Sequence, residues 1–110
     1  MHIKDLPGIV EAEIVQGVYE DGEIGGGYTS DLLSDVMAHA KAKDVLITIQ
    51  AHRNSIAVAG LVGASAIVIC NGRSVPEDMI EAARDEGIAL MRTDLNQYEV
   101  SGRLWKALRG

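Results

Sequence analysis

The residues best suited to bind a ligand follow two apolar segments of the chain. The segment 45–49 runs into the polar stretch 50–54, and the segment 66–70 runs into 71–74. Guanidinium groups hold carboxylates and phosphates in a bidentate geometry, and helix N-termini favour anions. We therefore predict a site for a small anion or nucleotide at these loops. Its residues are His52, Arg53, Asn54, Asn71, Gly72, Arg73 and Ser74. The alternative is a pair of ordinary polar loops, with Asn54 and Ser74 as helix caps.

A second candidate is the glycine-rich run 25–30. It resembles the start of a dinucleotide-binding fingerprint, but Ser30 replaces the third glycine and Asp44 precedes its strand instead of ending it. We therefore expect no nicotinamide site. The glycines then mark a strand or bend that needs unusual backbone angles or a close backbone approach. A weaker expectation of anion binding remains for the amides before the following helix. It adds Gly26, Gly27, Thr29 and Ser30 to the predicted site.

Three kinds of catalytic site are absent from the sequence. No lysine follows a glycine, which excludes a phosphate-transferring P-loop, and the near match to a hydrolase elbow at 63–67 lacks its last glycine. The histidines and Cys70 have no spacing typical of a metal site. We expect no enzyme, no cofactor and no metal. Cys70 ends an apolar segment and is expected to pack in the core, with redox sensing as the alternative.

Composition limits the class of protein and its partners. The 110 residues are 47% hydrophobic and 24% charged, which is typical of one globular domain spanning 1–110. A net charge of −6 without a basic cluster argues against nucleic acid. No segment is long and apolar enough to span a membrane, and the N-terminus does not read as a signal peptide, so we expect a cytoplasmic protein.

Short apolar segments alternate with amphipathic ones from residue 44 onward, which is typical of βαβ units. The segments 45–49, 66–70 and 88–91 are almost continuously apolar, as strands buried on both faces are. Residues 13–16 and 24–28 are weaker strand candidates. The fold class that follows is a single α/β domain with a mostly parallel sheet of four to five strands covered by helices.

Helices are expected between these strands. One begins near Ser30, and another spans 75–86 with Ser74 as its N-cap, a proline in the first turn and Gly87 as its end. A C-terminal helix is expected to start at Asp94 with Gln97. Its apolar side is predicted to be formed by Tyr98, Leu104, Trp105 and Leu108.

The segment 54–64 is a predicted helix of small and apolar residues. Such a helix has to be buried nearly all round. Either it packs between the sheet and a neighbouring helix, or part of it forms a subunit interface, since glycine and alanine permit close helix approach. The sequence leaves both possibilities open.

From about Gly25 to Leu108 the order of segments resembles the DRTGG domain. The strand 45–49 leads to His52-Arg53, where the family has an Asp-Arg pair, and the strand 66–70 leads to Asn71-Gly72, close to the family's Thr-Gly-Gly. Arg53 and Gly72 fit this pattern, while His52, Cys70 and Asn71 depart from it. The resemblance implies a fold similar to the N-terminal domain of HPr kinase, a regulatory role beside nucleotide-binding domains, and a tendency to dimerise.

Two functions follow from these observations. The first is a homodimeric regulatory module that binds a small anionic ligand or an adenine nucleotide, with the helix 54–64 or the C-terminal helix in the dimer interface. The second is a protein-docking accessory subunit of a larger enzyme complex without a small-molecule ligand. The resemblance implies a complex associated with hydrogenase as one example, since some members of the family lie near hydrogenase genes. An enzyme is the third class, and the sequence offers no catalytic set for it.

Overall fold

Five strands form one sheet in the computed structural model, which describes residues 1–110. They are β1 (Ala12–Gln16), β2 (Gly26–Thr29), β3 (Asp44–Thr48), β4 (Ala66–Ile69) and β5 (Ala89–Thr93), in the order β1-β5-β4-β3-β2. Strands β2 to β5 are parallel, and β1 is antiparallel to β5. The predicted mostly parallel α/β sheet of four to five strands is confirmed.

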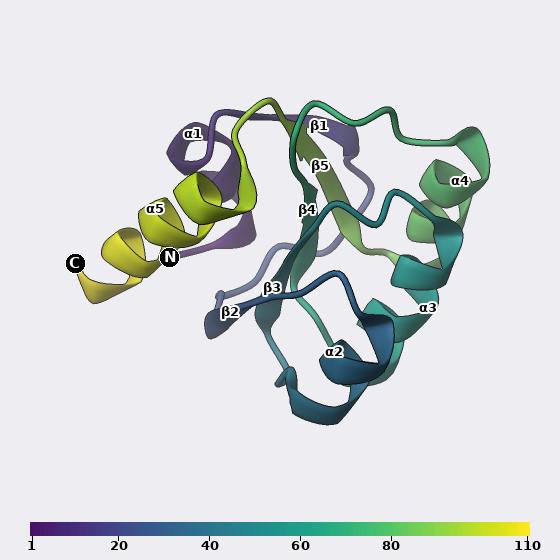
Figure 1. The fold of residues 1–110 in the computed structure, drawn as a ribbon, viewed down its shortest axis with the longest axis horizontal. Helices are drawn as coiled ribbons and strands as arrows, with labels where there is room; N and C mark the ends of the chain where they lie inside the picture. The colour runs from purple at the N-terminus through teal and green to yellow at the C-terminus, as the bar shows by residue number, and fades with distance from the viewer.

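Helices cover both faces of the sheet (Figure 1). The short η1 (Ile3–Asp5) and α1 (Leu6–Ile9) share one face with α5 (Gln97–Arg109), while α2 (Leu33–His39), α3 (Arg53–Val62) and α4 (Glu77–Glu86) lie on the other. The sequence pattern gave no signal for the two N-terminal turns, η1 and α1. None of the helices has the length and apolar character needed to cross a membrane.

Two hydrophobic clusters, one on each face, hold these layers together. Alternation along the central strands divides them: Val45 and Ile47 of β3 belong to the cluster under α5, and Leu46 belongs to the cluster under α2 to α4. All three side chains are buried. Burial on both faces is the reason that these strands are continuously apolar in sequence.

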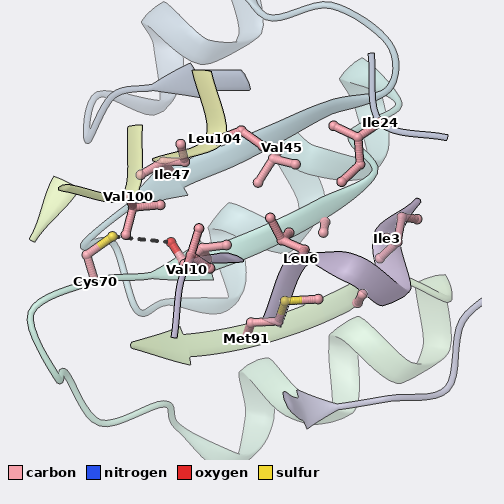
Figure 2. Close-up of a cluster of buried hydrophobic side chains, with 13 residues drawn as sticks. Ile3, Leu6, Val10, Ile24, Val45, Ile47, Cys70, Met91, Val100 and Leu104 are labelled. Atoms are coloured by element: carbon pink, nitrogen blue, oxygen red, sulfur yellow. Dashed lines mark hydrogen bonds between the residues drawn. The ribbon is translucent and has the colours of Figure 1, made fainter. Parts of the chain in front are cut away.

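Cys70 belongs to the cluster under α5, which also contains Val68 and Val100 (Figure 2). Its thiol is fully buried and lies 3.9 Å from the Val68 carbonyl oxygen, to which it donates. Burial raises the pKa of the Cys70 thiol to about 11. The predicted packing role is confirmed, and these surroundings are the opposite of those of a reactive thiolate.

The helix ends correct several predictions. Gly87 ends α4 in the left-handed region, as expected, but Pro76 and not Ser74 occupies the N-cap position. A residue before proline is extended, so Val75 directs the chain away from the helix and Ser74 lies too far out to cap it. Likewise, the capping box of α5 is formed by Asn96 with Glu99, not by Asp94 with Gln97. At α3 the cap is His52, whose Nδ1 accepts from the Asn54 amide, so Asn54 does not cap this helix.

Two predicted burial patterns were wrong in part. In α5, Leu104 is buried and Leu108 is partly buried, as predicted, whereas Tyr98 is 87% exposed and Trp105 is 63% exposed. The other buried residue of the helix is Val100. The helix carries two apolar rows, and only packing against β2 and β3 decides which one is covered. The helix 54–64 was expected to be buried nearly all round. Its outer row is open, and Leu61 on it is 74% exposed, because no other part of the chain covers this side.

Candidate functional site

The predicted ligand loops lie at the carboxyl ends of the parallel strands. This is the edge of an open α/β sheet at which ligands usually bind. Here, however, hydrogen bonds within the chain occupy much of the edge. Oδ1 of Asp31, just after β2, accepts from the Thr48 hydroxyl, the Ile49 amide and the Gln97 side chain, each at 2.9 Å. A single carboxylate therefore joins the ends of β2 and β3 to the start of α5.

The loop after β4 is held in a similar way. The amides of Asn71 and Gly72 donate to the Leu95 and Thr93 carbonyls, each at 2.9 Å. The guanidinium of Arg92 donates to the Gly72 carbonyl at 2.7 Å and to the Arg73 carbonyl at 2.8 Å. These two amides are not free to bind an anion. Neither of the two main cavities is lined by any residue of 71–74.

The residues that follow β3 lie apart from the loop that follows β4. Arg53 and Asn54 line a shallow depression of about 380 Å³ between α3 and α4, beside Ala82 and Glu86. The ring of His52 is used in capping α3. The structure therefore does not gather the predicted residues of the two loops into one cavity. Ligand binding by these residues stays a prediction.

The larger of the two main cavities is a groove of about 630 Å³ beside β2, and we call it the β2 groove. Three of the predicted site residues, Gly26, Gly27 and Thr29, line it, whereas Ser30 does not. The other lining residues come from the β2 segment itself, from the segment 39–47 and from α5. They are Gly25, Tyr28, His39, Lys41, Asp44, Ile47, Ser101, Leu104, Trp105, Leu108 and Arg109.

Missing side chains on β2 allow α5 to approach the strand. A Cβ added at Gly27 would lie 2.7 Å from a methyl group of Leu104, and one at Gly26 would lie 2.9 Å from the Asp44 carboxylate. The glycine run is therefore a strand that needs close approach, and none of its residues has a positive φ. The close neighbours are side chains, whereas the glycines in the sequence predicted a close approach of backbone.

The position of β2 in the sheet also exposes its backbone. It is the last strand and pairs only with β3. The Gly25 amide donates to the Lys43 carbonyl, so by alternation the backbone groups of Gly26 and Tyr28 point away from β3. The β2 groove thus offers unpaired backbone donors and acceptors to a bound molecule.

Cationic side chains lie on two sides of this groove. Lys41 comes from the turn after α2 and Arg109 from the last turn of α5, and both are exposed. The guanidinium of Arg109 lies 3.5 Å from the ring centre of Trp105, a cation–π contact that holds it beside the groove. Asp44 is the one carboxylate of the lining, so positive charge exceeds negative here in a chain of net charge −6.

A hydrogen-bonded group forms the α2 side of the groove. The Tyr28 hydroxyl donates to Oδ2 of Asp35 at 2.7 Å, and Nδ1 of His39 lies 3.1 Å from Oδ1 of the same carboxylate. The bond from Tyr28 lowers the pKa of Asp35, and the same bond raises the pKa of Tyr28. Asp35 therefore remains a carboxylate well below neutral pH and fixes the orientation of Tyr28.

Sequence reasoning missed Lys41, Trp105 and Arg109. Lys41 lies in a turn and Arg109 at a helix end, where basic residues are usually solvated, and Trp105 was assigned to the buried side of its helix. A basic residue four positions after an exposed tryptophan is the one available signal. It becomes informative only once α5 is known to pack beside β2. No group of His, Cys, Asp and Glu side chains is arranged to hold a metal ion.

Comparison with known proteins is informative at the level of structure. No protein-family model and no curated protein matches the sequence. By structure, the chain is similar to the CBS and DRTGG domains of the regulatory region of a Clostridium perfringens pyrophosphatase, in complex with the activator diadenosine tetraphosphate. The TM-score is 0.72 over 93% of this chain, with 15% sequence identity. This chain covers 44% of the length of that chain. The likeness is one of fold, and at that level it confirms the resemblance to the DRTGG domain.

Proposed function

We propose that this chain is a non-catalytic regulatory module that senses a small anionic ligand in the β2 groove. The observation that carries the proposal is the groove itself. It combines unpaired strand backbone at Gly26 with the cations Lys41 and Arg109 and an exposed indole at Trp105. These are the groups that bind phosphates and stack on flat rings. The proposed ligand site therefore lies along β2, the last strand of the sheet, and not at the loops where the strands end.

An adenine nucleotide is the ligand class to test first. The fold neighbour comprises the CBS and DRTGG domains of a regulatory region, in complex with the activator diadenosine tetraphosphate. In the β2 groove, phosphate oxygens would accept from Lys41 and Arg109, and the base would stack on Trp105. Stacking of this kind contributes about 1–3 kcal/mol per base. We also propose that the module is a homodimer.

Thermal unfolding against a ligand panel tests this function. The panel contains phosphate, AMP, ATP and diadenosine tetraphosphate. A ligand at 100 times its dissociation constant adds about 2.7 kcal/mol, which raises the Tm of a domain of this size by roughly 10 °C. We expect such a shift with at least one nucleotide. Fluorescence of Trp105, the one tryptophan, should change with it.

Matched variants locate the ligand. Lys41→Gln and Arg109→Gln should each weaken binding about tenfold, since a hydrogen bond to a charged group contributes about 1.5 kcal/mol or more. Arg84→Gln, an exposed arginine on α4, is the control and should leave binding unchanged. A shift lost in Arg73→Gln but kept in Lys41→Gln would place the ligand at the strand ends. No shift with any member of the panel would contradict nucleotide sensing.

The second candidate function is a docking subunit, and the unpaired edge of β2 favours it. An extended segment of a partner protein can add a strand to such an edge through backbone hydrogen bonds. The strand has no charged residue, proline or bulge, the features that usually protect an exposed edge. A flat response to the ligand panel, together with copurification of one protein at fixed stoichiometry, would favour this function.

A further inference from the structure

The outer side of α3 carries a row of exposed residues that nothing in the chain covers. Arg53, Ala57 and Leu61 follow one another at four-residue spacing and therefore share one face of the helix. All three are exposed, and Leu61, at 74%, is the most exposed large aliphatic side chain of the chain. Gly60 lies beside this row and is also exposed. In Figure 1, α3 and α4 lie on the side of the sheet away from α5.

The depression between α3 and α4 lies next to this row. Ile56, Ala57 and Ala82 form its apolar part, while Arg53 lines it together with the carboxylates at the end of α4. One of these is Glu86, whose Oε2 would be 3.6 Å from a Cβ at Gly60. The row thus has an arginine at its N-terminal end and a carboxylate beside its C-terminal end.

The charges at both ends are unfavourable within one chain. Arg53 is the first residue of α3, where the helix dipole disfavours a cation, and Asp85 and Glu86 are the last residues of α4, where it disfavours anions. None of the three forms an ion pair within 4 Å. The N-terminal end of the row therefore lacks a negative partner for Arg53, and the C-terminal end lacks a positive partner for Glu86.

We infer that α3 is the self-docking face of a homodimer, in which the α3 helices of two copies pack antiparallel about a two-fold axis near Ala57. Antiparallel packing brings Arg53 of each copy to Glu86 of the other, so both unfavourable charges gain a partner. The inference rests on the homodimer part of the proposed function and is independent of the ligand.

The surfaces of the two copies are also complementary in shape under this two-fold symmetry. With the axis at Ala57, Leu61 of one copy lies opposite position 53 of the other, over the depression between α3 and α4. A two-fold interface requires one patch to contain both the knob and the hole. Leu61 and the depression meet this requirement. Ala57 and Gly60 carry little side-chain volume, which permits the helix axes to approach to about 8 Å.

Exchanging the charges at positions 53 and 86 tests the inference. The molar mass in solution is measured by light scattering at tens of micromolar protein. The unsubstituted chain should be a dimer, and Leu61→Glu should be a monomer. Arg53→Glu and Glu86→Arg should each weaken the dimer at least tenfold, because each places like charges at both contacts. Mixing these two variants should restore a dimer, since every contact in the mixed dimer pairs opposite charges. All three positions are exposed, and an unchanged Tm and circular dichroism spectrum at low concentration verify folding.

The control is Tyr98→Glu, at the exposed start of α5, which should remain a dimer. A dimer that survives Leu61→Glu and is lost in Tyr98→Glu would overturn the α3 interface and leave the homodimer standing. Failure of the mixed variants to associate would overturn the charge pairing and with it the antiparallel arrangement. A monomeric wild type would overturn both, while the ligand panel would still decide the sensing function separately.

Discussion

The carboxyl-end edge of the sheet and the β2 groove contain similar residue types and use them differently. At the carboxyl ends, Asp31 and Arg92 direct their hydrogen bonds to loops of the same chain. At the β2 groove, the cations Lys41 and Arg109 form no ion pair, and backbone groups are left without strand partners. Polar residues near a strand end can therefore be structural, while an open site can arise beside them from residues of three separate segments.

The first prediction concerns thiol reactivity, where we expect the largest difference. Cys70 lies buried behind the carboxyl-end edge, and its pKa, raised from 9.0 to about 11, leaves about a hundredfold less thiolate near pH 8. We expect alkylation of Cys70 to be at least a hundredfold slower than alkylation of a cysteine introduced by Ser101→Cys in the β2 groove. Mass spectrometry of peptides distinguishes the two. Comparable rates would contradict a closed carboxyl-end edge.

The raised pKa of the Cys70 thiol also makes the free energy of unfolding depend on pH. The pKa is higher in the folded state, so the folded chain keeps a proton that the unfolded chain loses. The contribution to the free energy of unfolding is therefore fully present below about pH 9 and is lost as the pH rises towards about 11. Urea unfolding at pH 8 and pH 10.5, compared with Cys70→Ala, measures it. An equal loss in both chains would assign the effect to other groups.

The second prediction removes the hydrogen-bond acceptor at the carboxyl ends. Asp31→Ala leaves the Thr48 hydroxyl, the Ile49 amide and the Gln97 amide without their common partner. We expect the free energy of unfolding to fall by about 2–3 kcal/mol, because unsatisfied donors near the core are costly. Asp31→Asn keeps one oxygen acceptor and should lose about half as much. Chemical denaturation measures both, and a loss below about 0.5 kcal/mol would contradict the structural role.

The third prediction compares two glycines. Gly72 has a φ of +61°, and a Cβ there would lie 2.8 Å from the Asp94 carboxylate. Gly72→Ala should destabilise the fold by about 1–2 kcal/mol, since left-handed backbone disfavours a side chain. Gly102 on α5 has open space around it, so Gly102→Ala should stabilise by about 0.5–1 kcal/mol. Effects of the same sign would contradict the backbone argument.

The smallest expected effect is at the β2 groove. The hydroxyls of Thr29 and Ser101 lie 2.6 Å apart between β2 and α5. Ser101→Ala should change the free energy of unfolding by no more than about 0.5 kcal/mol, because water replaces the lost partner. A loss near that of Asp31→Ala would show that the groove, too, is structural and would remove the contrast between the two regions.

The sequence predicted the sheet better than it predicted the site. The strands 45–49, 66–70 and 88–91 were found within two residues of β3, β4 and β5, since burial on both faces leaves an unambiguous apolar pattern. Helix caps were less predictable. Serine, asparagine and aspartate at 74, 54 and 94 all resemble caps, but the proline at 76 and the ring of His52 decided otherwise. A capping signature shows that a helix begins nearby without fixing at which residue.

The sequence by itself determined the fold class, because alternating apolar and amphipathic segments of these lengths can bury their surfaces only as a parallel sheet between helices. It also determined that Cys70 is buried. Only the tertiary structure decided which apolar row of α5 is covered, which row of α3 is left open, and that Lys41, Arg109 and the glycines of β2 line one groove. The physical reason is the separation along the chain over which each effect acts. Periodicity and local propensity act over a few residues, while a groove between segments up to 84 positions apart depends on how completed elements pack, as Gly25 and Arg109 illustrate.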